Sequence, residues 1–305
     1  MVYSGIRIVE SLVVTETATE VSSTSKTITR DGVDYFPRQD ITTILVMGVD
    51  QNGPVEESTY YQNPGAADMV MLLIFDEAAE VCNILQLNRD TMLEMPVLGI
   101  GGKQAGTWYG QLAMSHTYGN GLEESCENTR KTVSNLLYGL YIDYYIAMNM
   151  DAITIANDAV GGVPVNITDD FSQVDPTIGM GKFTLIGDQA LTYVRSRQNV
   201  GDQLNVSRIQ RQKDYITSFA KQLREDQDRD SNFVVSVYEK LAPYIVTDCS
   251  VHAISGIMNR YGDYAVGRVE TPEGSNVLGN EYYEFYVDEE KLDALILELF
   301  YAPKK

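Results

Sequence analysis

The sequence has few of the side chains that most metal sites and nucleophilic sites use. It contains two histidines, His116 and His252, and three cysteines, Cys82, Cys126 and Cys249, all far apart along the chain. The cysteines match no zinc-ligand spacing, and a scattered odd set is more typical of buried free thiols. The sequence therefore gives no support to a zinc centre, a histidine-ligated metal or a serine–histidine catalytic pair.

The chain also lacks a basic balance and a long apolar run. It has 23 lysines and arginines against 43 aspartates and glutamates, a formal net charge of −20. Such a charge argues against nucleic acid or an anionic membrane surface as a general partner. No stretch of eighteen apolar residues is present, and the N-terminus does not read as a signal peptide.

Apolar runs without strict alternation are separated by amphipathic stretches, which is the pattern of strands buried on both faces. The expected strands are 41–49, 69–75, 81–87, 144–148 and 163–167. This order predicts an α/β fold, a three-layer α/β/α arrangement with a central mixed sheet flanked by helices. We expect residues 1–30 to form a stalk or edge segment and 31–305 a single domain, with a C-terminal extension from about 231 packed against it.

Other stretches give weaker signals. The glycine-rich stretch 96–110 is expected to be a loop, and 282–287 alternates like an edge strand. A helix over 151–160, capped by Asp151, should end at Gly161-Gly162. The C-terminal segment shows two further helices, 231–240 and 288–300, with irregular segments between them.

Four arginines, Arg195, Arg197, Arg208 and Arg211, fall within seventeen residues of this acidic chain. A guanidinium group stays charged and donates paired hydrogen bonds to phosphate oxygens. One interpretation of the cluster is therefore an anion site, and the other is a solvated helix face.

Helical spacing favours the anion site. A helix over 204–226 places Arg208, Arg211, Gln212 and Tyr215 on one stripe. A second, apolar stripe of Ile209, Ile216, Ala220 and Leu223 would dock the helix, with the polar stripe at the edge of the buried face. We expect a preceding helix over 188–194, followed by an extended Arg195-Ser196-Arg197 whose two arginines point the same way.

The same residues carry a resemblance. Tyr193-x-Arg195-x-Arg197 followed by Arg208-x-x-Arg211-Gln212 resembles the LytR–CpsA–Psr (LCP) family of bacterial cell-envelope proteins. Four upstream motifs agree with that family in order. They are 44–50 (ILVMGVD), 67–68 (AD), 89–91 (RDT) and 158–165 (DAVGGVPV). Together the five motifs span roughly 43–222, and the fold expected from the resemblance is the LCP-like α/β domain.

The resemblance implies roles for the acidic residues and for Arg89. Asp50 and Asp68 sit at strand edges, where spacing alone favours plain loop caps, but they match the family's metal-binding aspartates. Magnesium takes one or two carboxylates together with phosphate oxygens, so Mg²⁺ is the expected cofactor. Arg89 would join the four arginines in binding a pyrophosphate, Gln212 would donate to a phosphate oxygen, and Asp90 would hold an arginine in place.

The implied activity is that of a magnesium-dependent glycan phosphotransferase. It would move an anionic cell-wall glycopolymer, of the teichoic acid or capsule type, from a polyprenyl-pyrophosphate carrier to peptidoglycan. The catalytic residues would be Arg89, Asp90, Arg195 and Arg197, since phosphoryl transfer needs positioning and charge stabilisation more than a covalent nucleophile. The alternatives are a pyrophosphatase acting on the same lipid and a non-catalytic lipid- or glycan-binding regulatory module.

Two further expectations follow from the resemblance. The protein would work on the extracytoplasmic face of the bacterial membrane, held by an N-terminal helix not present in this chain, with no nucleic-acid partner. The lipid would need an apolar tunnel, for which Leu136, Leu137, Ile146 and Ile155 are candidates, although they also read as plain core. The chain departs from the family at Ala66-Ala67-Asp68, where Arg-Ser-Asp is common, and at Asn88, where proline is common.

Overall fold

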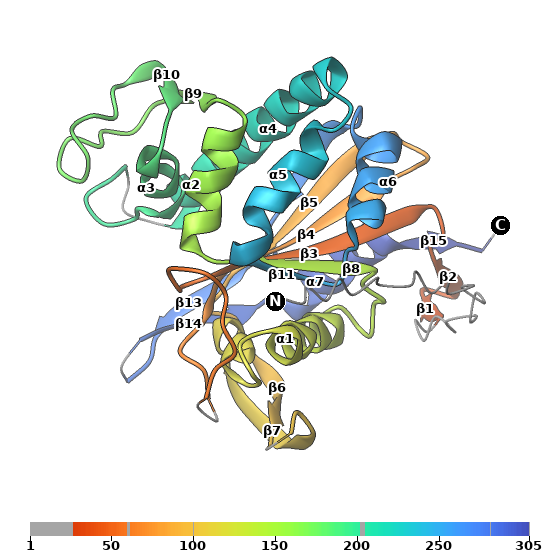
Figure 1. Ribbon diagram of the computed structural model, residues 1–305. Coiled ribbons are helices and arrows are strands. Elements are labelled where there is room, and N and C mark those ends of the chain that lie inside the picture. The colour runs from red at the N-terminus through yellow and green to blue at the C-terminus, as the bar shows by residue number, and fades with distance from the viewer. Residues whose placement is uncertain (1–26, 60–61, 100, 202–204, 281, 305) are drawn as a thin grey trace, which may run out of the picture.

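The computed structural model describes residues 27–59, 62–99, 101–201, 205–280 and 282–304. Most of the expected N-terminal stalk therefore lies outside the described residues. A six-stranded mixed sheet forms the centre, in the order β11-β8-β3-β4-β5-β12 (Figure 1). Its strands are β3 (Ile41–Val49), β4 (Ala67–Asp76), β5 (Val81–Leu87), β8 (Tyr144–Met148), β11 (Ile245–Thr247) and β12 (Ala265–Glu270).

Both kinds of pairing occur in this sheet. Strand β3 pairs antiparallel with β4 and parallel with β8, while β5 pairs antiparallel with β4 and parallel with β12. Strands β4 and β5 form the expected hairpin, with the turn over 77–80 as their tight connection. The mixed α/β sheet expected from the sequence is confirmed.

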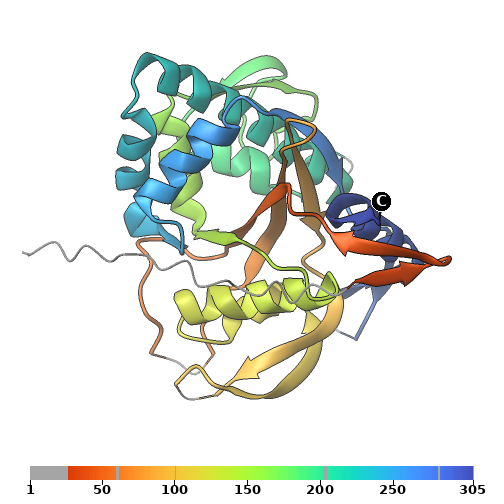
Figure 2. The same cartoon turned by 90° about the vertical axis from the view of Figure 1, so that its right-hand side faces the viewer.

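Seven α-helices and two short 3₁₀ segments complete the described part of the chain. They are α1 (Glu123–Leu136), α2 (Met150–Ala159), α3 (Asp188–Arg195), α4 (Asn205–Arg229), α5 (Phe233–Leu241), α6 (Val251–Tyr261), α7 (Glu289–Phe300), η1 (Leu112–Thr117) and η2 (Ala242–Tyr244). Helices α1 and α7 lie on one side of the sheet and α2, α4, α5 and α6 on the other (Figures 1 and 2). None of the described helices is long and apolar enough to cross a membrane.

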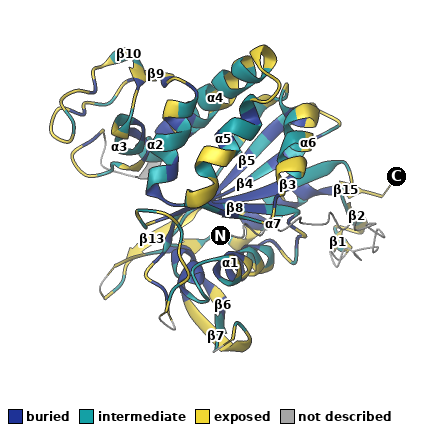
Figure 3. Cartoon of the chain, in the orientation of Figure 1, coloured by how far each residue is buried: buried dark blue, intermediate teal, exposed yellow. Residues whose placement is uncertain are grey.

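The alternation of side chains along β3 separates two cores. Leu45 and Met47 point into a large core that includes buried residues of α1 and α7, whereas Ile44 and Val46 join a smaller core with Ile216 of α4. Every residue of β3 from Thr43 to Val49 is buried. Figure 3 shows the same buried strands running through the centre of the molecule. A strand buried on both faces explains why its sequence shows no polar–apolar alternation.

The smaller strands form separate ribbons. They are β1 (Ile28–Arg30), β2 (Val33–Pro37) and β15 (Tyr301–Pro303) in one sheet, β9 (Val163–Ile167) with β10 (Gly181–Leu185), β6 (Met92–Leu98) with β7 (Gln104–Gln111), and β13 (Gly274–Leu278) with β14 (Tyr283–Val287). The expected strand 163–167 thus pairs with β10 and not with the central sheet.

The structure corrects three expectations outside the central strands. The stretch 96–110 is not a loop, because β6 and β7 pair there as antiparallel strands. The cap of α2 is Asn149, which accepts from the Ala152 amide, while Asp151 accepts from the Gly53 amide in the preceding loop. The irregular C-terminal segments contain β11, α6 and β12, so two of them add strands to the central sheet.

The strand predicted over 282–287 is present as β14, which pairs with β13 in a separate hairpin.

The three cysteines are free and buried in the structure. Burial raises the pKa of the Cys82 thiol to about 12 and raises the pKa of Cys126 and Cys249 as well. Thiols of this kind stay protonated near neutral pH and behave as small apolar side chains. The expectation of buried free thiols is confirmed.

Candidate functional site

Three neighbouring strands deliver charged residues to the same edge of the central sheet. The register pairs Val49 with Ala67 and Val70 with Leu87, so Asp50 leaves β3, Asp68 enters β4 and Arg89 follows β5 side by side. A bulge lies at the Gly48–Val49 step opposite Asp68. Bulges re-aim side chains and are frequent beside active sites. The expected convergence of Asp50, Asp68 and Arg89 is what the structure shows.

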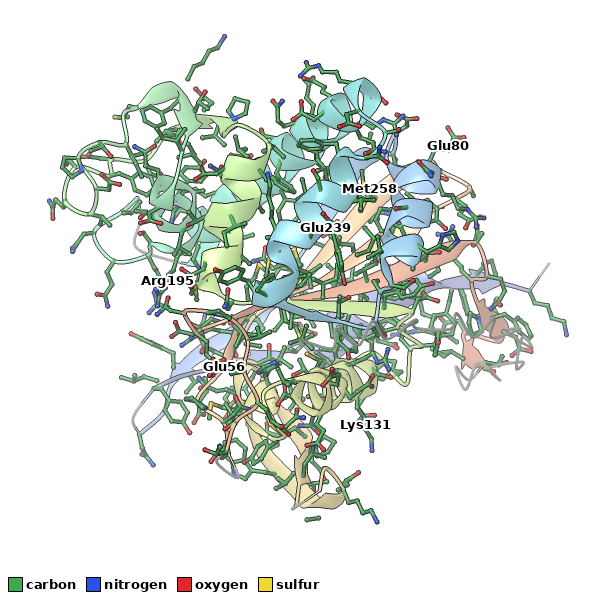
Figure 4. The ribbon with its side chains drawn as sticks, in the orientation of Figure 1. Glu56, Glu80, Lys131, Arg195, Glu239 and Met258 are labelled. Atoms are coloured by element: carbon green, nitrogen blue, oxygen red, sulfur yellow. The ribbon has the colours of Figure 1, made fainter. Side chains whose placement is uncertain are left out.

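Each of the two carboxylates meets an arginine. The guanidinium of Arg89 donates to Asp68 and lies 3.4 Å through Nε from Asp90 Oδ1. Arg195 Nη2 donates to Asp50 Oδ1 at 2.9 Å, and both of these side chains are about half exposed, at 52% and 44%. Arg195 is the labelled residue beside α2 and α3 in Figure 4. Four chain segments thus meet in one charged cluster.

Arg208 brings a further positive charge into this cluster. Burial lowers the pKa of Arg208, and the positive charges of Arg197 and Arg89 lower it further, against the opposing pull of Asp68 and Asp90. A bound anion would stabilise the charged form of such a guanidinium, because it offsets the repulsion from the neighbouring cations. The electrostatics of this edge therefore favour a negatively charged ligand.

The end of α3 differs from the expected local structure. Helix α3 includes Arg195, and only Ser196 turns extended, with φ −61° and ψ 134°. Arg195 and Arg197 are therefore not two residues of one strand-like piece. Both still lie near the charged cluster, because Arg195 contacts Asp50 and the charge of Arg197 lowers the pKa of Arg208.

Arg211 is not in the anion site. Its side chain is 4% exposed, stacks over Phe171 at 5.5 Å, and forms an ion pair with Asp169. Its remaining donors bind the carbonyl oxygens of Tyr193, at 3.0 Å, and Ser196. The expected phosphate contact by Arg211 is corrected to a bond between α4 and the end of α3.

Gln212, like Arg211, connects α4 to the end of α3 through a hydrogen bond. Its Nε2 donates to the Val194 carbonyl at 3.0 Å, and its Oε1 accepts from Gln86 of β5. The polar stripe of α4 is thus more buried than expected, because its amide and guanidinium groups satisfy the last carbonyls of α3. The proposed second stripe is also partly wrong, since Ala220 is exposed and the apolar contacts come from Tyr215, Ile216, Phe219 and Leu223.

An apolar cavity of about 220 Å³ opens beside the charged cluster. It lies on the α4 side of the sheet, between β3, β4, β8 and helices α2, α3, α4 and α5. Its polar lining comes from Asp68, Asn149, Arg195, Arg208 and Gln212. The apolar lining comes from Val46, Met69, Met71, Met148, Met150, Ala152, Ile153, Ala156, Leu191, Val194, Tyr215, Ile216, Phe219, Leu241 and Ile245.

None of the four residues expected to line a lipid tunnel lines this cavity. Leu136 and Leu137 lie at the end of α1, and Leu137 is buried in the core on the other side of the sheet. Ile146 packs in the smaller core, and Ile155 lies on α2 outside the cavity lining. The sequence signal that was missed is the group of methionines at the ends of β4 and β8, since methionine fills irregular apolar space adaptably.

The donor set at this edge fits a hard divalent cation that shares its shell with a phosphate. Asp50 and Asp68 offer carboxylate oxygens, which magnesium prefers. In the described part of the chain, no group of three or more histidine, cysteine, aspartate or glutamate side chains is placed to hold a metal ion. Two carboxylates leave most of an octahedral shell to water and to ligand oxygens.

Comparison with known proteins gives a consistent result. The family model described as the LytR_cpsA_psr family matches residues 8–300. The polyisoprenyl-teichoic acid–peptidoglycan teichoic acid transferase TagU of Halalkalibacterium halodurans is 28% identical over 86% of this chain and 79% of its own length. The Bacillus subtilis protein of the same name is 27% identical over 58% of this chain, and the matched part spans only half of that relative.

Solved structures share the fold. TagT bound to LI-WTA superposes with a TM-score of 0.66, covering 86% of this chain and 90% of that one, at 20% sequence identity. Crystal structures of B. subtilis TagV give a similar result, with a TM-score of 0.65 over 86% of this chain and 96% of that one, also at 20% identity. At this level of identity the likeness establishes the α/β architecture.

Proposed function

Because the chain belongs to the LytR_cpsA_psr family, we propose that it transfers a cell-wall glycopolymer of the teichoic acid type from a polyprenyl-pyrophosphate carrier to peptidoglycan. The observation that carries the proposal is the shared lining of one cavity. Asp68, Arg195 and Arg208 border the same space as Ile216 and Phe219. A cavity that is charged at one end and apolar elsewhere suits an amphipathic ligand with an anionic head and a hydrocarbon tail.

The arginines would act on the head group. Arg89, Arg195, Arg197 and Arg208 come from three separate elements and converge on the edge of the sheet, where they would neutralise the oxygens of a pyrophosphate. Arg211 and Gln212 contribute indirectly, because their bonds to the Tyr193, Val194 and Ser196 carbonyls hold the end of α3 in place. Asp90, 3.4 Å from Arg89, would orient that guanidinium.

The reaction itself would be a displacement at phosphorus. An acceptor hydroxyl oxygen forms a bond to the glycan-linked phosphorus, and the bridging phosphorus–oxygen bond breaks. Polyprenyl phosphate leaves with the bridging oxygen and takes up the proton that the hydroxyl loses. We propose that Asp50 and Asp68 hold Mg²⁺ jointly with the pyrophosphate. When bound, the ion would supply positive charge to the phosphate oxygens. The guanidinium partners of both carboxylates would move from aspartate to phosphate as the head group enters.

The decisive experiment is incubation with a polyprenyl-pyrophosphate-linked glycan and peptidoglycan oligomers, with and without magnesium. The proposal predicts a glycan–peptidoglycan phosphodiester and polyprenyl phosphate, both dependent on the acceptor. A lipid pyrophosphatase would release phosphorylated glycan without acceptor, and a binding module would give no product. The Arg195→Ala variant is the negative control, since its side chain is half exposed and its loss leaves the fold intact.

The apolar part of the cavity can be tested separately. Ala156 of α2 lines the cavity, so Ala156→Phe should fill it and weaken binding of a polyprenyl pyrophosphate by at least about tenfold, a change of about 1.4 kcal/mol. Ala220→Phe on the exposed side of α4 is the matched control and should bind like the native protein. Equal affinity of both variants for the lipid, measured by calorimetry, would contradict the placement of the hydrocarbon tail in this cavity.

A further inference from the structure

The exposed apolar side chains of the molecule are concentrated on two hairpins, β6–β7 and β13–β14. Among the described residues fifteen large apolar side chains are exposed, and nearly half of them lie on or directly beside these hairpins. They are Trp108, Tyr109, Val277, Leu278, Tyr282, Tyr283 and Tyr286. Five of the seven are aromatic. An apolar patch of this kind, rimmed by polar residues, is typical of a binding surface.

The two hairpins are held together. Thr91 and Phe285 form a parallel bridge, and the Phe285 amide donates to the Asp90 carbonyl at 2.9 Å. Gln111 at the end of β7 donates to the Tyr283 carbonyl at 2.9 Å. Figure 1 shows β13 and β14 beside β6 below the helical layer. Side chains alternate along a strand, so only one side of each hairpin carries Tyr109 and Tyr286. These two tyrosines lie close enough to interact electrostatically, and they mark one surface, here called the hairpin face.

The aromatic side chains of the two hairpins are held by their neighbours. Trp108, on the side of β7 away from the hairpin face, packs over Gly110 and meets Tyr118 edge-on at 6.3 Å between ring centroids. The hydroxyl of Tyr286 donates to Glu284, which raises the pKa of Tyr286, and Tyr109 lies near enough to contribute to that shift. Pre-oriented rings lose little conformational freedom when they bind a ligand.

The hairpin face adjoins the charged cluster directly. Gln111 Nε2, which bonds Tyr283, also donates to Asp90 Oδ1 at 2.9 Å, and the same carboxylate oxygen lies 3.4 Å from Arg89 Nε. A ligand on the hairpin face thus reaches the phosphate site from the side of β5 and β6. The apolar cavity approaches the same cluster from the α4 side of the sheet.

The charge of the hairpin face selects among ligand classes. Strands β6, β7, β13 and β14 contain no lysine or arginine, and their charged residues are Glu94 and Glu284. Anionic lipid head groups and the anionic glycopolymer would both meet repulsion there. An uncharged sugar chain fits, because aromatic rings pack on the apolar faces of sugar rings while carboxylate and amide groups bind hydroxyl and acetamido groups.

We propose that the hairpin face is the acceptor subsite and binds an uncharged chain of β-linked N-acetylhexosamines. Tyr109 and Tyr286 would supply the packing surface, and Gln111 would couple its occupancy to Asp90 and Arg89. The proposal rests on the proposed transferase function and adds where the acceptor lies. The donor lipid and the acceptor glycan then approach the arginine cluster from opposite sides, which leaves room for the displacement at phosphorus.

Calorimetry gives a direct test. Titration of the native protein with N-acetylglucosamine hexamer should give a saturable heat of binding. The double variant Tyr109→Ala, Tyr286→Ala should weaken the affinity by about tenfold or more, as expected for the loss of two aromatic contacts.

The matched control is the double variant Tyr138→Ala, Tyr141→Ala, which removes two tyrosines of similar exposure near the end of α1. It should bind the hexamer like the native protein. Absence of a saturable response in the native protein, or equal affinity of the two double variants, would overturn the acceptor subsite. A response to neutral phospholipid vesicles, or a hairpin-dependent dimer in sedimentation, without a response to the hexamer would overturn it equally.

Failure of this inference can be told apart from failure of the proposed function. Calorimetric binding of a polyprenyl pyrophosphate in the absence of acceptor should be the same in the hairpin variants as in the native protein. If the hairpin variants keep full transfer activity, the acceptor binds elsewhere and the transferase proposal stands. If Arg195→Ala keeps full activity, the transferase site itself is wrong.

Discussion

Both ends of the β3–β4 pair carry arginine–aspartate ion pairs, but those at one end are largely buried and multiply hydrogen-bonded, and the Arg195–Asp50 pair at the other end is exposed. At the end away from the cavity, Arg38 uses Nε and both terminal nitrogens to bind Asp40 and Asp76 at 2.7–2.9 Å. The side chains of Arg38 and Asp76 are only 16% and 11% exposed. At the cavity end, Arg195 meets Asp50 through a single nitrogen, and both side chains are about half exposed.

The difference separates a structural ion cluster from a ligand site. Arg38 and its carboxylates saturate one another and tie the start of β3 to the β4–β5 turn, where Asp76 also accepts from the Ala78 and Ala79 amides. The Asp50–Arg195 pair is open to solvent, and exposed pairs of this kind add about 0–1 kcal/mol to stability. Residue type alone therefore does not distinguish the two roles. They differ in whether the donors and acceptors of the ion pair are already saturated within the protein.

The largest expected contrast between the two ends is in turnover. Arg195→Ala should lower the transfer rate on the order of 10³-fold, because an arginine that stabilises phosphoryl transfer is worth that much or more. Arg197→Ala should behave similarly. Arg38→Ala, measured in the same assay at a temperature where it remains folded, should keep native turnover. Full activity of Arg195→Ala and Arg197→Ala would contradict the assignment of the open end as the reacting site.

The largest expected effect on stability comes from replacing Arg211, which is buried and is one of the four arginines clustered in the sequence. Arg211→Met should lower the free energy of unfolding by roughly 3 kcal/mol, since it leaves Asp169 and two carbonyl oxygens without their donor. Denaturant unfolding measures the loss. Arg208→Met is the comparison within the same helix, and a loss as large as that of Arg211→Met would contradict the different roles assigned to the two arginines.

Arg38→Ala should lower stability and leave turnover unchanged, the opposite of what is expected for Arg195→Ala. The free energy of unfolding should fall by about 2–3 kcal/mol, because Asp76 is left buried without its cationic partner. Arg195→Ala should change it by less than about 1 kcal/mol. Parallel urea titrations of the two variants give the comparison, and equal losses would mean that the cavity end is as closed as the other.

The smallest expected effect is a pH dependence at the closed end. Hydrogen bonds from Arg38 lower the pKa of Asp40 and of Asp76, against the opposing effect of burial. A carboxylate with a depressed pKa in the folded state stabilises the protein above its unfolded pKa of about 3.9 and loses that contribution as pH falls through the folded value. Asp76→Asn should therefore flatten the fall in stability below about pH 4. If the free energy of unfolding of Asp76→Asn falls below about pH 4 as steeply as that of the native protein, the role of Asp76 is contradicted.

Much of the fold follows from local sequence pattern. Strands β3, β4, β5 and β8 and helices α2 to α5 and α7 lie close to where their apolar periodicity places them, because each buries a face that the sequence makes apolar. Strands β6, β7, β11 and β12 are among those that were not predicted. Their stretches are short, rich in glycine or weakly alternating, and pairing with β5, with β8 or with each other supplies the stability that local propensity does not.

The site was predictable in its charged part and less so in its apolar part. Asp50, Asp68 and Arg89 flank buried strands, and the family resemblance assigned them, together with Arg195, to one site. Arg211 was misplaced because helical spacing gives the direction of a side chain but not its partners, here Asp169 and the end of α3. The cavity lining depends on packing between helices and sheet, which no local pattern encodes.

The most direct test of the central claim is calorimetric titration of a polyprenyl pyrophosphate, with and without magnesium, on the native protein and on Asp68→Ala. Asp76→Ala at the closed end is the matched control. The account predicts that magnesium tightens binding to the native protein and to Asp76→Ala, and that Asp68→Ala loses most of that gain. Binding to the native protein that is unchanged by magnesium would contradict the claim that Asp50 and Asp68 hold the ion jointly with the pyrophosphate.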